Sequence, residues 1–338
     1  MRMLRSLLAA SATIVLTLPF ALCSAQAQTA AIGKLTGGTG LHIPSYVAMD
    51  KGFFKEEGLD ARFVSLGGRT LVTAGLAGQI DFVPIPSGGA QAALKGAKIR
   101  YVVNQSLQPQ WIIITRKEIT KPEELKGKTL AFGRAGSADY DEGATVLARF
   151  FQMQAGRDYK VISIGGEPER IAALVNGDVD GALVSTPRAA PAVKAGLKVV
   201  LRTGELLPRA GGAFWVTDDY FAKNQPTVQK FIRAIAKGVM YFRDNKAGSL
   251  PTLQEHLGIP PDEAGAVWDE LHNTFAAELP KDLFREIFES RRLDLVASKE
   301  WAADKAMPDP EGFLARDLLE KTLADMKYVP TKMNSKTN

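Results

Sequence analysis

The sequence predicts an α/β protein of two similar lobes followed by a helical C-terminal region. From Ile32 to about Leu201, short apolar runs of strand length alternate with segments of helical periodicity. This alternation is typical of βα units around mostly parallel sheets. After Asn224 the strand-like runs give way to helical patterns. The length of 338 residues and the hydrophobic content of 46% also fit about two ordinary globular domains.

The predicted strands are short apolar runs bounded by turn-forming or charged residues. They cover 33–36, 61–64, 81–85, 99–104, 111–115, 129–132, 160–164, 181–184 and 198–201. The helices predicted among them cover 45–50, 70–77, 90–95, 138–154, 168–176 and 188–195. In the last third we predict helices over 226–245, 261–275, 281–292 and 311–327. The first of these places Val228, Phe231, Ile235 and Val239 on one stripe, which indicates an amphipathic helix.

An internal repeat supports the two-lobe interpretation. Leu66-Gly67-Gly68 opens a unit that runs through a helix to Gly78-Gln79-Ile80-Asp81 and a short strand. Ile164-Gly165-Gly166 opens a second unit that reaches Gly177-Asp178-Val179-Asp180 and another strand. One interpretation is that all βα units look alike. The other, which we favour, is a pair of lobes built from related units.

The first 27 residues have the pattern of a cleavable export signal. Arg2 and Arg5 precede an uncharged apolar run over 7–22, and Ala25-Gln26-Ala27 is a cleavage signal of the A-x-A type. We therefore expect a periplasmic protein that begins at Gln28. The single cysteine, Cys23, lies in the predicted leader, so the mature chain is expected to hold no disulfide and no cysteine nucleophile.

Candidate ligand contacts follow the predicted strands, because ligands of open α/β sheets lie beyond the carboxyl ends of strands and near helix N-termini. Hydroxyl, imidazole, guanidinium and aromatic groups occur at these points. The candidates are Thr39, His42, Ser87, Arg134, Ser137, Thr186, Arg188 and Phe214. Arg134 and Ser137 precede a long helix, where a guanidinium, a hydroxyl and free N–H groups could together bind an anion. The alternative is that most of these residues only form turns and caps.

Signals for other functions are missing from the sequence. Gly127-Lys128-Thr129 lacks the first glycine of a phosphate-binding loop, and no G-x-S-x-G motif occurs. The three histidines do not have metal-ligand spacing, so we expect no metal and no cofactor. Basic residues are scattered despite the net charge of +5, so we expect no nucleic-acid partner.

One stretch resembles a known family. The segment 43–59, IPSYVAMDKGFFKEEGL, resembles the P-x-Y-V-A-x-D-K-G-F-F-K-x-E-G-L stretch of the nitrate, sulfonate and taurine class of ABC-transporter solute-binding proteins. Gly78-Gln79-Ile80-Asp81-Phe82 is similar to the family's G-x-x-D-F, and 121–128 resembles its entry into the second lobe. The domain is shared with thiamine-pyrimidine synthases, but those enzymes carry a cysteine-rich motif that is missing here.

The resemblance implies a type II periplasmic-binding-protein fold with two lobes and a two-segment hinge. We expect residues 28–115 and 205–338 to form lobe one, and 116–204 to form lobe two, with crossings near 115–117 and 202–212. The function implied is a monomeric, non-enzymatic solute-binding protein that closes on a small organic anion and delivers it to an ABC permease. The alternatives are an enzyme on the same fold, such as a lyase or a pyrimidine-forming synthase, and a ligand-sensing subunit of a membrane receptor.

Overall fold

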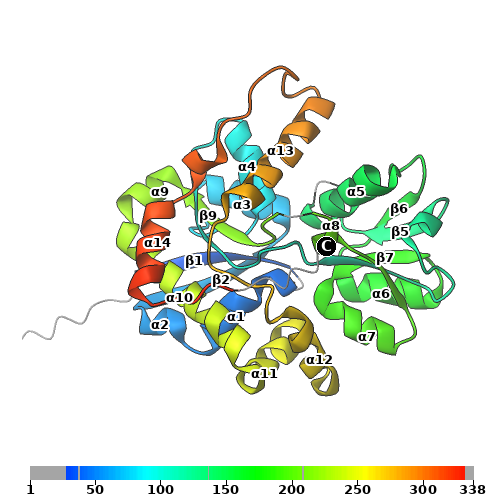
Figure 1. Ribbon diagram of the computed structural model, residues 1–338, viewed down its shortest axis with the longest axis horizontal. Coiled ribbons are helices and arrows are strands. Elements are labelled where there is room, and N and C mark those ends of the chain that lie inside the picture. Colours follow the sequence, from blue (N-terminus) through cyan, green and yellow to red (C-terminus); the bar gives the residue numbers. More distant parts are fainter. Residues whose placement is uncertain (1–27, 37–38, 136, 208, 332–338) are drawn as a thin grey trace, which may run out of the picture.

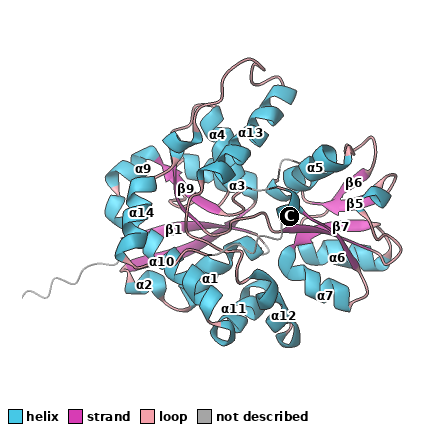
Figure 2. Cartoon of the chain, in the orientation of Figure 1, coloured by secondary structure: helices cyan, strands magenta, loops and turns pink. Residues whose placement is uncertain are grey.

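The computed structural model describes residues 28–36, 39–135, 137–207 and 209–331. The chain forms two lobes, each with its own β-structure covered by helices (Figure 1). Strands lie inside both lobes and helices lie outside them (Figure 2). The predicted leader, 1–27, lies outside the described residues. No helix in the described ranges is both long enough and apolar enough to cross a membrane.

The first lobe contains two strand pairs joined by a short bridge. The strands are β1 (Gln28–Leu35), β2 (Leu59–Leu66), β3 (Ile99–Asn104) and β9 (Ala213–Thr217). β1 and β2 are parallel, whereas β3 and β9 are antiparallel. Phe82 bridges to Ile32 and Val83 bridges to Trp215, which connects the two pairs. The strand predicted over 81–85 is therefore wrong in length, because Pro84 and Pro86 lack the N–H groups that a longer ladder needs.

Helices surround this β-structure and form the C-terminal part of the lobe. They are α1 (Ile43–Asp50), α2 (Phe53–Glu56), α3 (Gly68–Leu76), α4 (Pro86–Leu94), α9 (Asp218–Lys223), α10 (Gln225–Asp244), α11 (Lys246–Leu257), α12 (Pro261–Leu271), α13 (Lys281–Ala297) and α14 (Arg316–Asp325). The predicted stripe of α10 is confirmed: Val228, Phe231, Ile235 and Val239 are fully buried in the largest core. The sequence analysis missed α11, whose interior contains Pro251.

The second lobe contains a five-stranded sheet in the order β6-β5-β7-β4-β8. The strands are β4 (Trp111–Thr115), β5 (Thr129–Phe132), β6 (Lys160–Ser163), β7 (Gly181–Ser185) and β8 (Lys198–Arg202). The helices are α5 (Ala138–Phe151), α6 (Glu167–Asn176), α7 (Ala189–Lys194) and α8 (Thr203–Leu206). β5 is parallel to β6 and β7, but β4 is antiparallel to β7 and β8. The expectation of mostly parallel sheets is therefore wrong for β4 here and for β3 and β9 in the first lobe.

The position of β4 also corrects the first crossing between the lobes. We expected β4 in the first lobe and a crossing near 115–117, but β4 pairs with both β7 and β8 of the second sheet. The chain therefore crosses at 105–110. The second crossing includes residues 209–212, after α8, and lies within the expected 202–212. The two crossings lie together, since Gln105 N donates to Gly212 O at 2.7 Å and Gly211 N donates to Ser106 O at 3.0 Å.

The internal repeat has the same structure in both lobes. Asp81 follows Gly78, which has a φ of +73°, and its Oδ2 accepts a 2.8 Å hydrogen bond from Ala31 N in β1. Asp180 follows Gly177, which has a φ of +85°, and its Oδ2 accepts a 2.9 Å bond from Thr129 N in β5. Glycine is favoured at both turns because other residues rarely adopt this left-handed backbone. The repeat is thus a pair of equivalent helix–turn–strand units.

Candidate functional site

The two lobes face each other across a cleft with a large part and a small part. The large part has a volume of about 1130 Å³ and lies between α3, α4 and α13 of the first lobe and α5 of the second. The small part has a volume of about 30 Å³, and its lining includes Leu41, Ser87, Trp111, Glu142 and Arg209. Ser87 lines both parts, so they are neighbours at the start of α4. Residues from both lobes and from the second crossing thus surround this space.

The lobes touch where Gly40 lies against Pro187. A Cβ on Gly40 would lie 2.8 Å from Gln110 Oε1 and 2.8 Å from Pro187 Cδ. Both distances are shorter than real Cβ contacts, so only glycine allows this approach. Gly40 opens the 3₁₀ turn between β1 and α1, and Pro187 lies in the turn between β7 and α7. Two of the strand-end loops chosen from the sequence therefore meet across the cleft.

Four residues from the two lobes and the first crossing have a buried polar atom with no partner among the described residues. These atoms are Thr39 Oγ1, Tyr46 Oη, Gln110 Oε1 and Glu167 Oε1. We call these four residues the cleft cluster. Thr39 and Tyr46 belong to the first lobe, Gln110 to the first crossing and Glu167 to the second lobe. Buried polar groups are normally hydrogen-bonded, so such atoms on both sides of the lobe contact indicate a place for a polar ligand.

Glu167 is the charged member of the cleft cluster. Its Oε2 accepts a 2.8 Å hydrogen bond from Ser185 Oγ and a 3.3 Å bond from Arg188 Nε. Burial raises the pKa of the carboxyl, while the Arg188 charge and the Ser185 hydroxyl oppose that shift. The Glu167 charge also acts on Tyr46: together with burial, it raises the pKa of the Tyr46 hydroxyl. Glu167 thus offers a ligand one oriented acceptor atom.

Arg188 is oriented by Glu167 and is mostly buried. Its side chain is 14% exposed, and the Nε–Oε2 contact with Glu167 is its ion pair. No hydrogen bond from its Nη groups to the described residues is present. A guanidinium held at Nε presents its terminal N–H groups as a fork for a planar anion. Arg188 is therefore the predicted site residue with the geometry best suited to an anion.

His42 is buried between β1 and α1. Leu35 N donates a 3.2 Å hydrogen bond to its Nε2, so a neutral ring carries its proton on Nδ1. Nδ1 has no partner among the described residues. Burial, assisted by the charge of Lys34, lowers the pKa of His42 to about 3. The imidazole is thus a neutral donor at physiological pH and not an anion-binding cation.

Ser137 has the helix-capping geometry that its position predicts. Its Oγ accepts a hydrogen bond from Tyr140 N at 3.4 Å and donates to Asp139 Oδ1 at 2.5 Å. Asp139 in turn pairs with Arg170 at 2.8 Å, and this guanidinium also donates to Leu183 O at 2.7 Å. The start of α5 therefore already contains a carboxylate, which competes with an anion for the same N–H groups.

The remaining predicted site residues have different positions. Arg134 is exposed, and Ser87 and Thr186 are half-buried at the starts of α4 and of the turn before α7. Thr186 N donates to Gln110 O at 2.8 Å, which ties this loop to the first crossing. Phe214 is fully buried and packs edge-on against Phe231 in the core. Phe214 therefore has the position of a core residue of the first lobe, whereas the sequence predicts a ligand contact for it.

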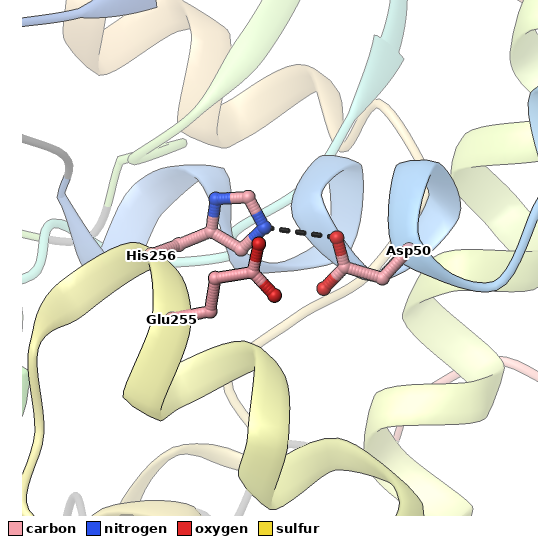
Figure 3. A group of neighbouring side chains, drawn as sticks. All are labelled: Asp50, Glu255 and His256. Carbon is pink, nitrogen blue, oxygen red and sulfur yellow. Dashed lines mark hydrogen bonds and ion pairs between the residues drawn. The ribbon is translucent and has the colours of Figure 1, made fainter.

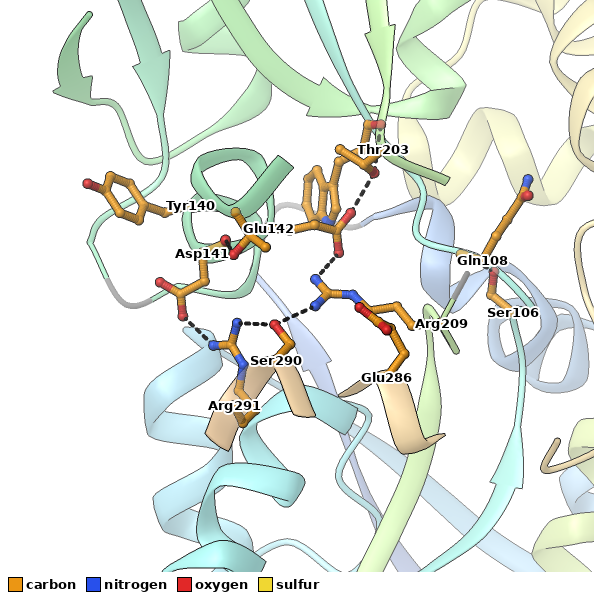
Figure 4. Close-up of polar contacts among 12 residues, drawn as sticks. Ser106, Gln108, Tyr140, Asp141, Glu142, Thr203, Arg209, Glu286, Ser290 and Arg291 are labelled. Atoms are coloured by element: carbon orange, nitrogen blue, oxygen red, sulfur yellow. Dashed lines mark hydrogen bonds and ion pairs between the residues drawn. The ribbon is translucent and has the colours of Figure 1, made fainter. Parts of the chain in front are cut away.

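A second polar network joins the lobes beside the small part of the cleft (Figure 4). Glu142 of α5 pairs with Arg209 of the second crossing at 2.9 Å and accepts a hydrogen bond from Thr203 at 2.5 Å. Arg209 also donates to Ser290 of α13 at 3.4 Å. Beside it, Arg291 of α13 pairs with Asp141 of α5 at 3.2 Å. These contacts hold α5 of the second lobe close to α13 of the first.

The sequence analysis did not select Tyr46, Glu142 or Glu167 as site residues. Tyr46 lies in the segment 43–59, which served only to identify the family. Glu167 follows the strand predicted over 160–164, so the rule that ligands lie beyond strand ends could have found it. Gln110 carried no signal, since an amide before a strand is common. Metal-ligating side chains of the described residues converge only outside the cleft, at Asp50, Glu255 and His256.

Two α/β lobes, two adjacent crossings and a polar cleft between them define the periplasmic-binding-protein fold. Residues 40–247 match the protein family described as NMT1/THI5 like. The match covers more than half of the chain, and the chain therefore belongs to this family.

Known proteins with the same fold extend the comparison. The alkanesulfonate-binding protein SsuA from Xanthomonas axonopodis pv. citri, bound to MOPS, matches with a TM-score of 0.67 at 20% identity, over 87% of this chain and 100% of that chain. The periplasmic nitrate-binding protein NrtA from Synechocystis PCC 6803 matches with a TM-score of 0.71 at 14% identity, over 89% and 90%. "Putative binding protein YtlA" of Bacillus subtilis strain 168 is 26% identical over 308 residues, covering 87% of this chain and 86% of that protein.

Proposed function

We propose that this protein is a periplasmic solute-binding protein of an ABC importer. It captures a small organic anion between its lobes by hinge closure, without a covalent step. The single observation that carries the proposal is the cleft cluster, in which Thr39, Tyr46, Gln110 and Glu167 each have a buried polar atom without a partner among the described residues, and these residues come from both sides of the lobe contact. Membership of the family and the likeness to sulfonate- and nitrate-binding proteins support the same function.

The chemistry of the cleft cluster limits the ligand. Glu167 Oε1 and Gln110 Oε1 are acceptors, so the ligand carries at least one N–H or O–H donor. Arg188 supplies free terminal N–H groups beside Glu167, so the ligand also carries an anionic group. We therefore propose a carboxylate or sulfonate that bears a hydroxyl or amino group. A bare inorganic anion would leave both acceptors unsatisfied, which costs about 1–3 kcal/mol for each neutral group.

Export and delivery form the cellular part of the proposal. The leader pattern of residues 1–27 implies translocation with cleavage before Gln28. Mass spectrometry of protein from the periplasmic fraction tests this directly, with an N-terminus at or near Gln28 as the expected result. A full-length chain in the cytoplasm, or a lipid on Cys23, would contradict it.

A thermal-shift panel tests the proposed ligand class. The panel contains hydroxy- and amino-substituted carboxylates and sulfonates, their unsubstituted parents, nitrate and pyrimidines. A ligand that binds only the folded protein raises its stability by about 2.7 kcal/mol at a hundred times Kd. We expect a rise in Tm with substituted anions and a smaller rise with their parents. A response to nitrate or to neutral pyrimidines alone would overturn the ligand class while leaving the binding function intact.

A further inference from the structure

A separate polar cluster lies outside the cleft, where α1 meets α11 (Figure 3). Asp50 is the last residue of α1, and Glu255 and His256 lie in the final turn of α11. One ligand atom from each of these three residues lies within 4.8 Å of the other two. The sequence alone gives no sign of this group, because 206 positions separate Asp50 from His256. Folding brings one imidazole and two carboxylates together.

The geometry of the cluster suits a small metal ion. His256 Nε2 lies 2.9 Å from Asp50 Oδ1. Two ligands on a tetrahedral zinc ion, each about 2.0–2.1 Å from it, lie roughly 3.3 Å apart, so a small widening admits the ion. The Glu255 carboxylate is exposed and makes no hydrogen bond or ion pair with the described residues. It is therefore free to rotate toward the other two ligands.

Neighbouring side chains fix the orientation of two of the ligands. Thr252 Oγ1 donates a 2.6 Å hydrogen bond to Asp50 Oδ2, the oxygen that does not face His256. Tyr46 stacks on the His256 ring with centroids 4.3 Å apart and an interplanar angle of 7°. Contacts of this kind, which orient the ligands from behind, are typical of metal sites and strengthen metal affinity.

The electrostatics of the cluster favour a cation. α1 ends at Asp50 and α11 ends at Leu257, so the C-terminal ends of two helices converge on the same point. Helix C-termini carry partial negative charge, and a carboxylate at such an end is ordinarily unfavourable. Lys51 is next to Asp50 in sequence, but its ammonium group lies over the Tyr241 ring at 5.3 Å. A divalent ion would neutralise two carboxylates and two helix ends at once.

We propose that Asp50, Glu255 and His256 bind a divalent first-row transition metal, and that zinc is the probe best suited to the site. The set of one nitrogen and two oxygen ligands matches zinc sites with three protein ligands, which leave a fourth position for water. The ion would connect α1 to α11. The proposal does not depend on which solute enters the cleft.

Calorimetric titration of the untagged, EDTA-treated and dialysed full chain with zinc chloride tests this site. We expect one Zn²⁺ per chain, with affinity reduced about tenfold or more in Glu255→Gln and in His256→Ala. Glu255→Gln is the sharper variant, because the carboxylate has no structural partner to lose. His272→Ala is the matched control: His272 directly follows α12 and, like His256, stacks on an aromatic ring (Trp268, centroids 4.2 Å apart), but it lies outside the cluster.

Two results would overturn the proposal. One is the absence of Zn²⁺ uptake by the wild-type chain at micromolar protein. The other is a Glu255→Gln variant, folded by circular dichroism, that binds Zn²⁺ as tightly as the wild type. Retained affinity in His272→Ala together with loss in the two cluster variants would support it.

Discussion

His42 shows how one buried side chain makes folding depend on pH. Burial and Lys34 lower its pKa to about 3, whereas an unfolded chain has a histidine pKa near 6.5. Between these values the unfolded state binds a proton that the folded state does not. Stability therefore falls as pH drops from about 6.5 toward 3, by at most about 1.4 kcal/mol per pH unit from this residue. Above pH 6.5 the contribution is constant.

His42→Gln tests this dependence, because glutamine keeps an acceptor for Leu35 N and does not titrate near neutrality. We expect the free energy of unfolding, measured in urea, to fall less between pH 7 and pH 5 in the variant than in the wild type. His272→Gln, at a half-buried histidine outside the cores, is the control for the substitution itself. Parallel curves for wild type and His42→Gln would contradict the assignment.

Arg188 and Arg134 make different predictions for anion binding. Arg188 is held by Glu167 with its terminal N–H groups free, whereas Arg134 is exposed. A charge-assisted hydrogen bond contributes about 1.5–3 kcal/mol, so Arg188→Ala should weaken binding about tenfold to a hundredfold. Arg188→Lys should lose less, because it keeps the charge but not the fork. The Kd of the ligand found in the thermal-shift panel, measured by calorimetry, provides the comparison.

Arg134→Ala is measured in parallel, since the sequence predicts the same role for it. A small change in Kd is expected from its exposure and from the carboxylate of Asp139 at the start of α5. A larger loss in Arg134→Ala than in Arg188→Ala would place the anion at the α5 N-terminus instead.

At the scale of elements, the turn before β7 and its counterpart in the first lobe each place an aspartate against a neighbouring strand. Asp81 and Asp180 each accept a hydrogen bond from a backbone N–H of the neighbouring strand, at 2.8 and 2.9 Å. Loss of the acceptor leaves a strand N–H group unpaired and costs about 1–3 kcal/mol. We expect Asp81→Ala and Asp180→Ala each to lower the free energy of unfolding by at least that amount, and Asp180→Ala also removes an ion pair with Arg116.

The two losses should be roughly additive in the double variant, since the residues lie in different lobes. The matched variants Asp81→Asn and Asp180→Asn retain an oxygen acceptor and should lose less. Urea unfolding followed by circular dichroism measures both series. Equal stability of the alanine and asparagine variants would show that the N–H contact contributes nothing.

The elements also show what could and could not be predicted from sequence. The bounds of β3, β4 and β5 follow directly from apolar runs, and the stripe of α10 follows from its periodicity. The sheet to which a strand belongs could not be predicted in the same way. The run Trp111–Thr115 fits either lobe, and only its pairing with β7 and β8 shows that it belongs to the second. The cleft cluster could not be predicted for the same reason. Tyr46 lies in α1 and Glu167 begins α6, and neither position by itself indicates a ligand contact.

The whole molecule has its lobes in contact on both sides of the crossings. Arg149 pairs with Glu286 and Arg202 pairs with Glu270, and Lys194 of α7 pairs with Glu263 of α12 at 3.2 Å. These pairs are partly exposed to solvent, so each contributes little and is weakened by salt. Closure must therefore depend on shape and on the ligand more than on these ion pairs. The tightest shape constraint is the approach of Gly40 to Pro187.

Gly40→Ala tests closure through that contact. The added methyl group would lie 2.8 Å from Pro187 Cδ, and a proline ring in the turn before α7 cannot rotate away. We expect the variant to bind the ligand about tenfold more weakly, which corresponds to about 1.4 kcal/mol of strain in the closed form. Small-angle scattering should show compaction on ligand saturation in the wild type and less compaction in Gly40→Ala.

Gly165→Ala is the control, because a Cβ there meets nothing within 4 Å. If Gly40→Ala compacts and binds like the wild type, the Gly40–Pro187 contact does not limit closure, and an unchanged wild-type radius at saturation would argue against hinge closure itself.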